Sequence, residues 1–243
     1  MDRQKALELQ GLTKIYKNNR GVFDLDLDIY EGDIFGFFGP NGAGKTTAMK
    51  VMTGMMQADR GDVRIFGHSI KDSFEAAVRN VGCIIETAET YSYLTAYENL
   101  RLFARYYPDV NAGRIDEVLN ITGIFKYRNE KASNFSLGMK QRLGIAAAIL
   151  SRPRLVILDE PLNGMDVEGM VEMRKLIKGL SANEGTTFFI SSHLIHDVEL
   201  TCDRIGVIFE GRLLSVDTTA NILKSHASLE NYFMSEVDRY GKL

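Results

Sequence analysis

Residues 39–47 have the composition and spacing of a phosphate-binding loop, which we call the P-loop. Its glycines allow successive backbone N–H groups to face one phosphate, and the helix predicted after it adds the positive end of its dipole. Lys45 can then reach the outer phosphates of a nucleoside triphosphate, and Thr46 can ligate Mg²⁺. An ordinary glycine-rich turn does not need a Lys-Thr pair at its end. The predicted phosphate-binding residues are Gly39, Pro40, Asn41, Gly42, Ala43, Gly44, Lys45, Thr46 and Thr47.

Two carboxylates, Asp159 and Glu160, directly follow the apolar residues 155–158. This run predicts a buried strand, and ligands bind at the carboxyl ends of strands in an open α/β sheet. We expect Asp159 to make a second contact to Mg²⁺ through water. Glu160, one residue further, points in a different direction from Asp159 and can polarise the water that attacks the outer phosphate. A solvated strand end is the alternative interpretation, and the P-loop upstream favours the chemical one.

His193 follows another predicted strand, residues 186–190, after two serines. At a strand end its imidazole can hydrogen-bond the terminal phosphate or the attacking water. An isolated histidine is more often a surface or core residue, and His68, His196 and His226 are interpreted in that way.

Apolar runs predict the elements that position these residues. Residues 34–38 form a short apolar run before the P-loop and residues 46–53 are typical of a helix, which gives the loop its strand-loop-helix context. Residues 155–158 and 186–190 are further strands, and a predicted helix at residues 167–180 joins them. This alternation implies right-handed crossovers and a parallel sheet.

The flanking parts of the chain contain shorter strands. Residues 23–29 alternate strictly between apolar and polar types, which predicts a half-buried strand. Glu86 follows the apolar residues 81–85 and so lies at another strand end. Other expected elements are strands at residues 6–12 and 61–67, a hairpin of 205–209 with 212–216, a helix at 74–80 and a helical tail at 222–235.

The stretch from residue 87 to residue 150 has no strand signal and is expected to be a helical insertion. Thr95 and Glu98 have capping-box spacing, which predicts the start of a helix. Further helices are expected at residues 115–121 and 137–150. The predicted organisation is a single domain, residues 1–243, with an α/β core and antiparallel β subdomain from residues 1–86 and 151–243, and a helical subdomain from residues 87–150.

The overall composition argues against several classes of protein. The chain has 243 residues, 45% of them hydrophobic, so it can bury a sizeable core. Its formal net charge of -3 shows no basic excess, so no nucleic-acid partner is expected. No stretch approaches the roughly 18 consecutive apolar residues of a membrane span. Cys83 and Cys202 lack close pairing and are expected to be free thiols in a reducing cytoplasm.

One further segment, residues 135–142 (Phe-Ser-Leu-Gly-Met-Lys-Gln-Arg), looks like the LSGGQ motif of ATP-binding-cassette (ABC) proteins. The chain resembles the nucleotide-binding subunit of an ABC transporter over nearly its whole length. The resemblance implies a P-loop NTPase (RecA-like) α/β core with a mostly parallel sheet, an N-terminal antiparallel β subdomain and an inserted α-helical subdomain. It also implies ATP and Mg²⁺ as ligands. In the head-to-tail dimer of this family, Ser136 and the Gly138 N–H would bind the ATP of the partner copy.

The same resemblance implies roles for other residues. Tyr16 matches the aromatic residue that stacks on adenine. Asp166 matches the acid of the D-loop, the segment that crosses the dimer interface. Glu160 matches the catalytic base, His193 matches the switch histidine near the terminal phosphate, and Lys45 matches the phosphate-binding lysine that acts with them.

Three positions depart from the family pattern. Glu86 stands where the family usually has a glutamine; it can still ligate Mg²⁺, and it adds negative charge near the γ-phosphate. We therefore expect an altered dependence of activity on metal or pH. Leu137 and Met139 replace the usual Gly and Gln of the LSGGQ motif. Glu86 and residues 136–139 together resemble the subunits of bacterial exporters that confer resistance to bacitracin and lantibiotics.

The expected function is an ATPase that closes as a dimer around two Mg·ATP and drives a separate membrane permease. The dimer partner would be a second copy or a homologous ATPase subunit, held in the cytoplasm at the inner face of the cell membrane. A permease helix would dock near residues 86–97, with Tyr91, Tyr93 and Leu94 as candidate contacts. Two alternatives stay open: a soluble non-transport ABC ATPase, and a regulatory nucleotide-binding subunit with little turnover.

Overall fold

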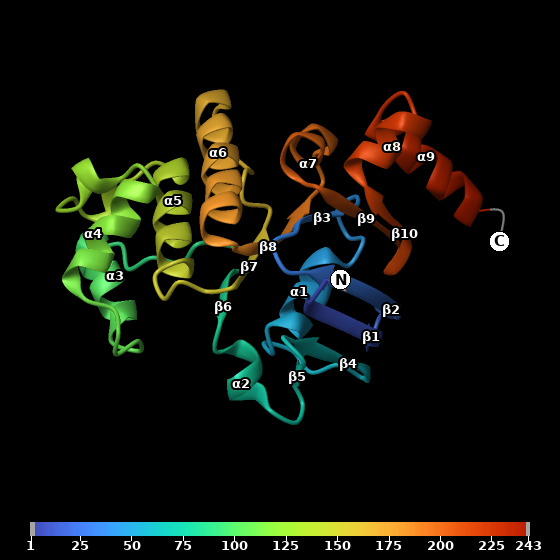
Figure 1. Ribbon diagram of the computed structural model, residues 1–243, viewed down its shortest axis with the longest axis horizontal. Helices are drawn as coiled ribbons and strands as arrows, with labels where there is room; N and C mark the ends of the chain where they lie inside the picture. Colours follow the sequence, from blue (N-terminus) through green and yellow to red (C-terminus); the bar gives the residue numbers. More distant parts are fainter. Residues whose placement is uncertain (1–2, 242–243) are drawn as a thin grey trace.

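The computed structural model describes residues 3–241 and has a six-stranded sheet at its centre, in the order β10-β9-β3-β8-β7-β6 (Figure 1). Neighbouring strands are parallel, except that β9 and β10 form an antiparallel hairpin. The expected mostly parallel sheet and its terminal hairpin are therefore confirmed. The strands are β3 Ile34–Phe38, β6 Val81–Ile84, β7 Leu155–Asp159, β8 Thr187–Ser192, β9 Arg204–Phe209 and β10 Arg212–Thr218.

A second, antiparallel sheet of four strands is built from the N-terminal part of the chain, in the order β2-β1-β4-β5. Its strands are β1 Lys5–Ile15, β2 Gly21–Tyr30, β4 Arg60–Ile65 and β5 His68–Ser69. The strict alternation expected for residues 23–29 is wrong at its start. Asp24 has a φ of 53°, and the register with β1 shifts around it. Val22 rather than Phe23 is therefore buried, because a bulge moves the pleat by one residue.

The helices cover the sheets, and α3, α4 and α5 gather at the end of the molecule away from α8 and α9 (Figure 1). The expected capping box opens α3: Thr95 Oγ1 accepts from the Glu98 N–H at 3.1 Å, and Glu98 Oε2 accepts from the Thr95 N–H at 2.8 Å. The limits of the helical subdomain at residues 87 and 150 stay a prediction. The helices are α1 Lys45–Met52, α2 Phe74–Val78, α3 Ala96–Ala104, α4 Ala112–Ile121, α5 Leu137–Ala148, α6 Val167–Glu184, α7 Ile195–Thr201, α8 Thr219–Ser225 and α9 Leu229–Tyr240, with 3₁₀ turns at Phe125–Tyr127 and Ala132–Asn134.

The helical tail expected at residues 222–235 is two helices, α8 and α9, rather than one. Each has its own N-cap: Thr218 Oγ1 accepts from the Asn221 N–H at 3.1 Å, and Ser228 Oγ accepts from the Asn231 N–H at 3.2 Å. The second cap stops continuation from α8, because a capping residue leaves the helical backbone conformation. Within residues 3–241, every helix is too short or too polar to cross a lipid bilayer.

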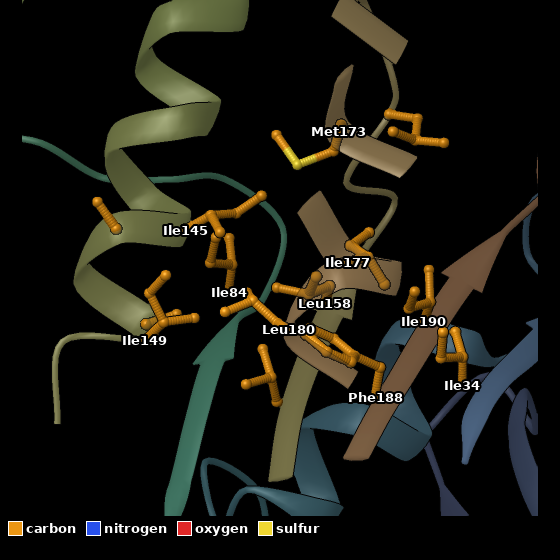
Figure 2. Packing of buried hydrophobic residues seen from close by; sticks show 14 of the residues in the cluster. Ile34, Ile84, Ile145, Ile149, Leu158, Met173, Ile177, Leu180, Phe188 and Ile190 are labelled. Carbon is orange, nitrogen blue, oxygen red and sulfur yellow. The ribbon is translucent and has the colours of Figure 1, made fainter. Parts of the chain in front are cut away.

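Two hydrophobic clusters lie on opposite faces of the central sheet. On one face, Ile84, Leu158 and Phe188 of the strands pack with Ile145 of α5 and Met173 of α6 (Figure 2). On the other face, α1 and the antiparallel sheet pack against Phe35, Phe37, Leu155, Ile157 and Phe189. Because both faces are covered, β3, β6 and β7 are nearly continuous apolar runs, and Asp159, Ser191 and Ser192 lie at the carboxyl ends of β7 and β8.

Replacement of Phe189 by alanine is expected to lower the free energy of unfolding by about 3–5 kcal/mol. Phe189 is fully buried, and its ring centroid lies 5.6 Å from that of Phe35 and 5.3 Å from that of Phe37. Urea unfolding followed by circular dichroism measures the loss. The control is Tyr106→Ala, at a tyrosine 80% exposed, which should stay within about 0.5 kcal/mol of the unsubstituted chain. Equal losses in the two variants would contradict this packing.

Candidate functional site

The P-loop connects β3 to α1 and needs glycine at specific positions. Gly42 and Gly44 have φ angles of 82° and 105°, a region that favours glycine. A Cβ atom at Gly39 would lie 2.2 Å from the Ile208 carbonyl oxygen, and one at Gly44 would lie 2.7 Å from Val22 Cγ1. Residues 39–44 are therefore a tightly packed backbone turn, and α1 begins at Lys45, one residue earlier than the helix expected at residues 46–53.

Lys45 is buried, and its ammonium group lies inside the curve of the P-loop. Nζ donates to the Gly39 carbonyl oxygen at 2.7 Å and to the Pro40 carbonyl oxygen at 3.2 Å, and it lies 3.5 Å from Glu160 Oε1. Two loop carbonyls and one carboxylate thus hold the cation at the position where the loop can receive an anion.

The Asp159 carboxylate, at the end of β7, is 4% exposed and joins three segments of the chain. Oδ2 accepts from Thr46 Oγ1 at 2.9 Å and from the Glu86 N–H at 3.3 Å, and Oδ1 accepts from Ser191 Oγ at 2.5 Å. Sequence reasoning did not single out Ser191 as a site residue. The available signal was its place at the polar end of a predicted strand; the structure adds that Ser191 lies opposite Asp159 in the β7–β8 register.

Glu160 and His193 form a pair beside this carboxylate. Glu160 Oε2 lies 2.9 Å from His193 Nδ1, and the Glu160 N–H donates to Ser191 Oγ at 3.0 Å. Glu160 has a φ of 48°, a conformation that non-glycine residues adopt rarely and at a cost of about 1–3 kcal/mol. The chain turns sharply there, so the Glu160 side chain leaves the direction of β7 and reaches both Lys45 and His193.

Glu86 follows β6 and is also held in an unusual conformation, with a φ of 67°. Its N–H is bonded to Asp159, while its side-chain Oε1 lies 2.6 Å from Nζ of Lys50 on α1. The hydrogen bond to this carboxylate raises the pKa of Lys50 above its ordinary value. No sequence pattern singles out Lys50, which has the position of an ordinary lysine on a helix surface.

A pocket of about 380 Å³ opens in front of the P-loop. Tyr16 is at its edge; the hydroxyl lies 3.3 Å from Thr47 Oγ1, and the residue is 37% exposed. Asn18 and Arg20, which the sequence analysis did not include, line the same pocket. The remaining lining residues are Gly21, Asn41, Gly42, Gly44, Lys45, Thr46, Thr47 and Glu160.

Ser136, Gly138 and Asp166 line a different pocket, of about 210 Å³, between the N-termini of α5 and α6. Ser136 caps α5 by accepting from the Met139 N–H at 3.3 Å, and Asp166 caps α6 by accepting from the Gly169 N–H at 2.9 Å. The residues lining this pocket and the P-loop pocket do not overlap. One chain therefore brings Tyr16, the P-loop, Glu86, Asp159, Glu160 and His193 together, and places the residues of the LSGGQ-like motif and Asp166 at a second location.

A glycine-rich loop at the carboxyl end of a parallel strand, with strand-end carboxylates beside it, defines a P-loop nucleoside triphosphatase. The sequence profile described as "ABC transporter" matches residues 22–163. The chain belongs to the ABC transporter family as an ATP-binding and ATP-hydrolysing subunit, so the prediction of its class is confirmed.

Two relatives carry names that indicate transport. The bacitracin transport ATP-binding protein BcrA of Enterococcus faecalis is 41% identical over 97% of this chain and 77% of its own length. The lantibiotic transport ATP-binding protein SrtF of Streptococcus pyogenes is 37% identical over 86% of this chain and 89% of its own length. The expected similarity to the bacitracin and lantibiotic subgroup is confirmed.

Two solved structures show the same fold. An ATP-binding subunit of an ABC transporter superposes with a TM-score of 0.85 at 29% identity, covering 96% of this chain and 99% of that chain. MJ0796, a bacterial ABC transporter cassette described as dimeric, superposes with a TM-score of 0.79 at 24% identity, covering 88% of this chain and 98% of its own.

Replacement of Ser191 by alanine is expected to lower the free energy of unfolding by about 1–3 kcal/mol. It removes a donor from the buried Asp159 carboxylate and an acceptor from the Glu160 N–H at the same time. Urea unfolding measures the loss. The control is Ser225→Ala, at an exposed serine whose hydroxyl bonds to the Asn221 carbonyl one turn earlier, and it should change stability by less than about 0.5 kcal/mol. A stability loss no larger than that of the control would contradict the role given to Ser191.

Proposed function

We propose that the P-loop pocket binds Mg·ATP, and that this subunit hydrolyses it with the residues gathered there. The observation that carries the proposal is the contact of Thr46 Oγ1 with Asp159 Oδ2, at 2.9 Å, in the site that also holds Lys45 and Glu160. Hydroxyl and carboxylate oxygens are ligands that suit Mg²⁺. Thr46, Asp159 and Glu86 would hold the ion, which would neutralise charge on the phosphates.

The remaining P-loop residues bind and orient the nucleotide in this proposal. Phosphate oxygens accept from the loop N–H groups and from Lys45, replacing the carbonyl contacts that Lys45 makes to its own loop. Tyr16, at the edge of the pocket, stacks on the adenine ring. Asn18 and Arg20 line the same pocket as Tyr16 and are available to the ribose or base.

Glu160 is the proposed general base, because it is the carboxylate that lies between Lys45 and His193. A water positioned between Glu160 and the γ-phosphate would lose its proton to the carboxylate as it attacks. The contact of 2.9 Å with His193 Nδ1 fixes the direction of the Glu160 side chain. In this contact Nδ1 donates to the carboxylate, so Nε2 can donate toward the terminal phosphate only in the imidazolium form, in which both ring nitrogens carry a hydrogen.

Ser136, Gly138 and Asp166 are proposed to act on the nucleotide of a partner copy. Support comes from their position in a pocket separate from the P-loop pocket, and from the N-terminus of α5, a site suited to an anion. The fold is that of cassettes described as dimeric. Met139 lines the same pocket, and Leu137 is 60% exposed and lies against Gly164, so both are available to the partner surface.

The transport role is proposed to be export of a peptide antibiotic through a permease on another chain, at the inner face of the cell membrane. Support comes from relatives named for transport of bacitracin and lantibiotics. Tyr91 and Tyr93, 45% and 66% exposed, pack edge to face with ring centroids 6.0 Å apart and are the proposed permease contacts, together with Leu94. The relatives named for transport disfavour the non-transport alternative.

Replacement of Glu160 by glutamine is expected to lower ATP turnover at least about 100-fold while ATP binding is retained, because the amide cannot accept the proton from water. Phosphate release by the purified chain measures turnover, and a fluorescent ATP analogue measures binding. The matched control is Glu184→Gln, at an exposed glutamate at the end of α6, which should hydrolyse ATP at the unsubstituted rate. Turnover in Glu160→Gln equal to that of the control would remove Glu160 from the mechanism and favour a weakly hydrolysing regulatory subunit.

The dimer is tested by cysteines at Ser136 and at Asn41, an exposed residue of the P-loop. In the Glu160→Gln background with Mg·ATP, oxidation should link two chains of the Ser136→Cys, Asn41→Cys variant, as seen on a non-reducing gel. Burial raises the pKa of both native thiols, Cys83 and Cys202, which disfavours the thiolate form that reacts in disulfide formation. Without nucleotide, crosslinking should fall several-fold.

The matched control for crosslinking moves the first cysteine to Ser225, an exposed residue of α8. This Ser225→Cys, Asn41→Cys variant should remain monomeric on the gel under the same oxidation. Crosslinking of the Ser136 variant no greater than that of the Ser225 variant would overturn the proposed contact of Ser136 with the partner's nucleotide.

A further inference from the structure

The ion pair between Lys50 of α1 and Glu86, after β6, has no place in the roles given above. Lys50 Nζ lies 2.6 Å from Glu86 Oε1, with side chains 28% and 60% exposed. Lys50 is four residues after Thr46, so the two residues lie on the same side of α1, one turn apart. The pair therefore lies next to the site where Thr46 and Asp159 meet.

The backbone of Glu86 is fixed by the same carboxylate that receives Thr46. Its N–H donates to Asp159 Oδ2 at 3.3 Å, and its φ of 67° belongs to a conformation that glutamate adopts rarely. The backbone thus anchors Glu86 beside the proposed magnesium site, whereas its side chain is directed to Lys50. A glutamate here has two competing partners of positive charge, the ammonium group and the magnesium ion.

The charge of Glu86 makes this competition important. An unpaired carboxylate beside a triphosphate repels it, and a carboxylate free to turn toward the metal strengthens the binding of the metal. A neutral glutamine at the same position would repel the triphosphate less and would strengthen metal binding less. The ion pair with Lys50 therefore keeps Glu86 away from the phosphates and reduces its availability to the metal.

We propose that Lys50 is a positioning residue that holds the Glu86 carboxylate in an ion pair which Mg·ATP must break, and that it thereby sets how strongly nucleotide binding depends on Mg²⁺. This inference rests on the proposed binding of Mg·ATP at the P-loop. Lys50 acts through Glu86 and needs no contact with the phosphates. Its effect must therefore disappear when Glu86 is neutral.

The experiment is a double-mutant cycle with the full chain: unsubstituted, Lys50→Gln, Glu86→Gln and the double variant. Equilibrium binding of a fluorescent ATP analogue is measured with Mg²⁺ and with EDTA. The readout is the affinity in Mg²⁺ divided by the affinity in EDTA. Lys50→Gln should raise this ratio about two- to fivefold, the size of an exposed ion-pair contribution. In the Glu86→Gln background the same substitution should change the ratio by less than about 1.5-fold.

Two further variants separate the possible outcomes. Lys50→Arg keeps the cation and should preserve the ratio, whereas Lys45→Ala should abolish binding of the analogue. An equal change on Lys50→Gln in both Glu86 backgrounds, or an unchanged ratio in both, would overturn the role of Lys50 while binding at the P-loop stands. Analogue binding by Lys45→Ala as tight as by the unsubstituted chain would instead overturn the proposed P-loop site, and the inference with it. Thermal melting of each variant shows that the fold is retained.

Discussion

The site depends on a buried carboxylate that must be satisfied by hydrogen bonds. A carboxylate removed from water is costly unless donors surround it. Asp159 finds them in the Thr46 hydroxyl, the Ser191 hydroxyl and the Glu86 N–H, which come from α1, β8 and the chain after β6. Movement of any of these three segments would remove one of the three donors from a buried charge. The same requirement therefore fixes the P-loop, Glu160 and Glu86 relative to one another.

The parallel sheet brings these segments to one edge. Strand β7 pairs with β6 on one side and β8 on the other, with Ile84 opposite Leu158 and Asp159 opposite Ser191. Both faces of these strands are packed, so a shift of one residue in register would exchange the two hydrophobic clusters. The packing that stabilises the sheet thus also sets which polar residues meet beyond its carboxyl end.

Local patterns were enough to predict the P-loop, the strand-end acids, the capping box of α3 and the parallel sheet, because residues close together in sequence determine each of them. Three features could not be predicted in this way. Ser191 and Lys50 matter through partners 32 and 36 residues away in sequence, and each has an ordinary local context. The bulge at Asp24 depends on pairing with β1, and only the pairing shows that the pleat shifts. Tertiary contacts, rather than propensities, decide these positions.

In a single chain the charged and polar side chains of the site form hydrogen bonds and ion pairs with one another. Lys45 is held by the carbonyls of its own loop and by Glu160, and Glu160 is held by Lys45 and His193. Ser136 and Asp166 use their side-chain oxygens to cap their own helices. In the proposed mechanism, phosphate oxygens replace the present partners of Lys45, and loss of the ion pair with Lys45 leaves the Glu160 side chain with its contact to His193. If binding releases the base in this way, hydrolysis requires rearrangement of the existing polar network, and a partner surface that covers the phosphates would favour the rearranged state. The closed dimer would then be the form in which the base is directed at water, which is how ATP binding and hydrolysis can drive opposite movements of one pair of subunits.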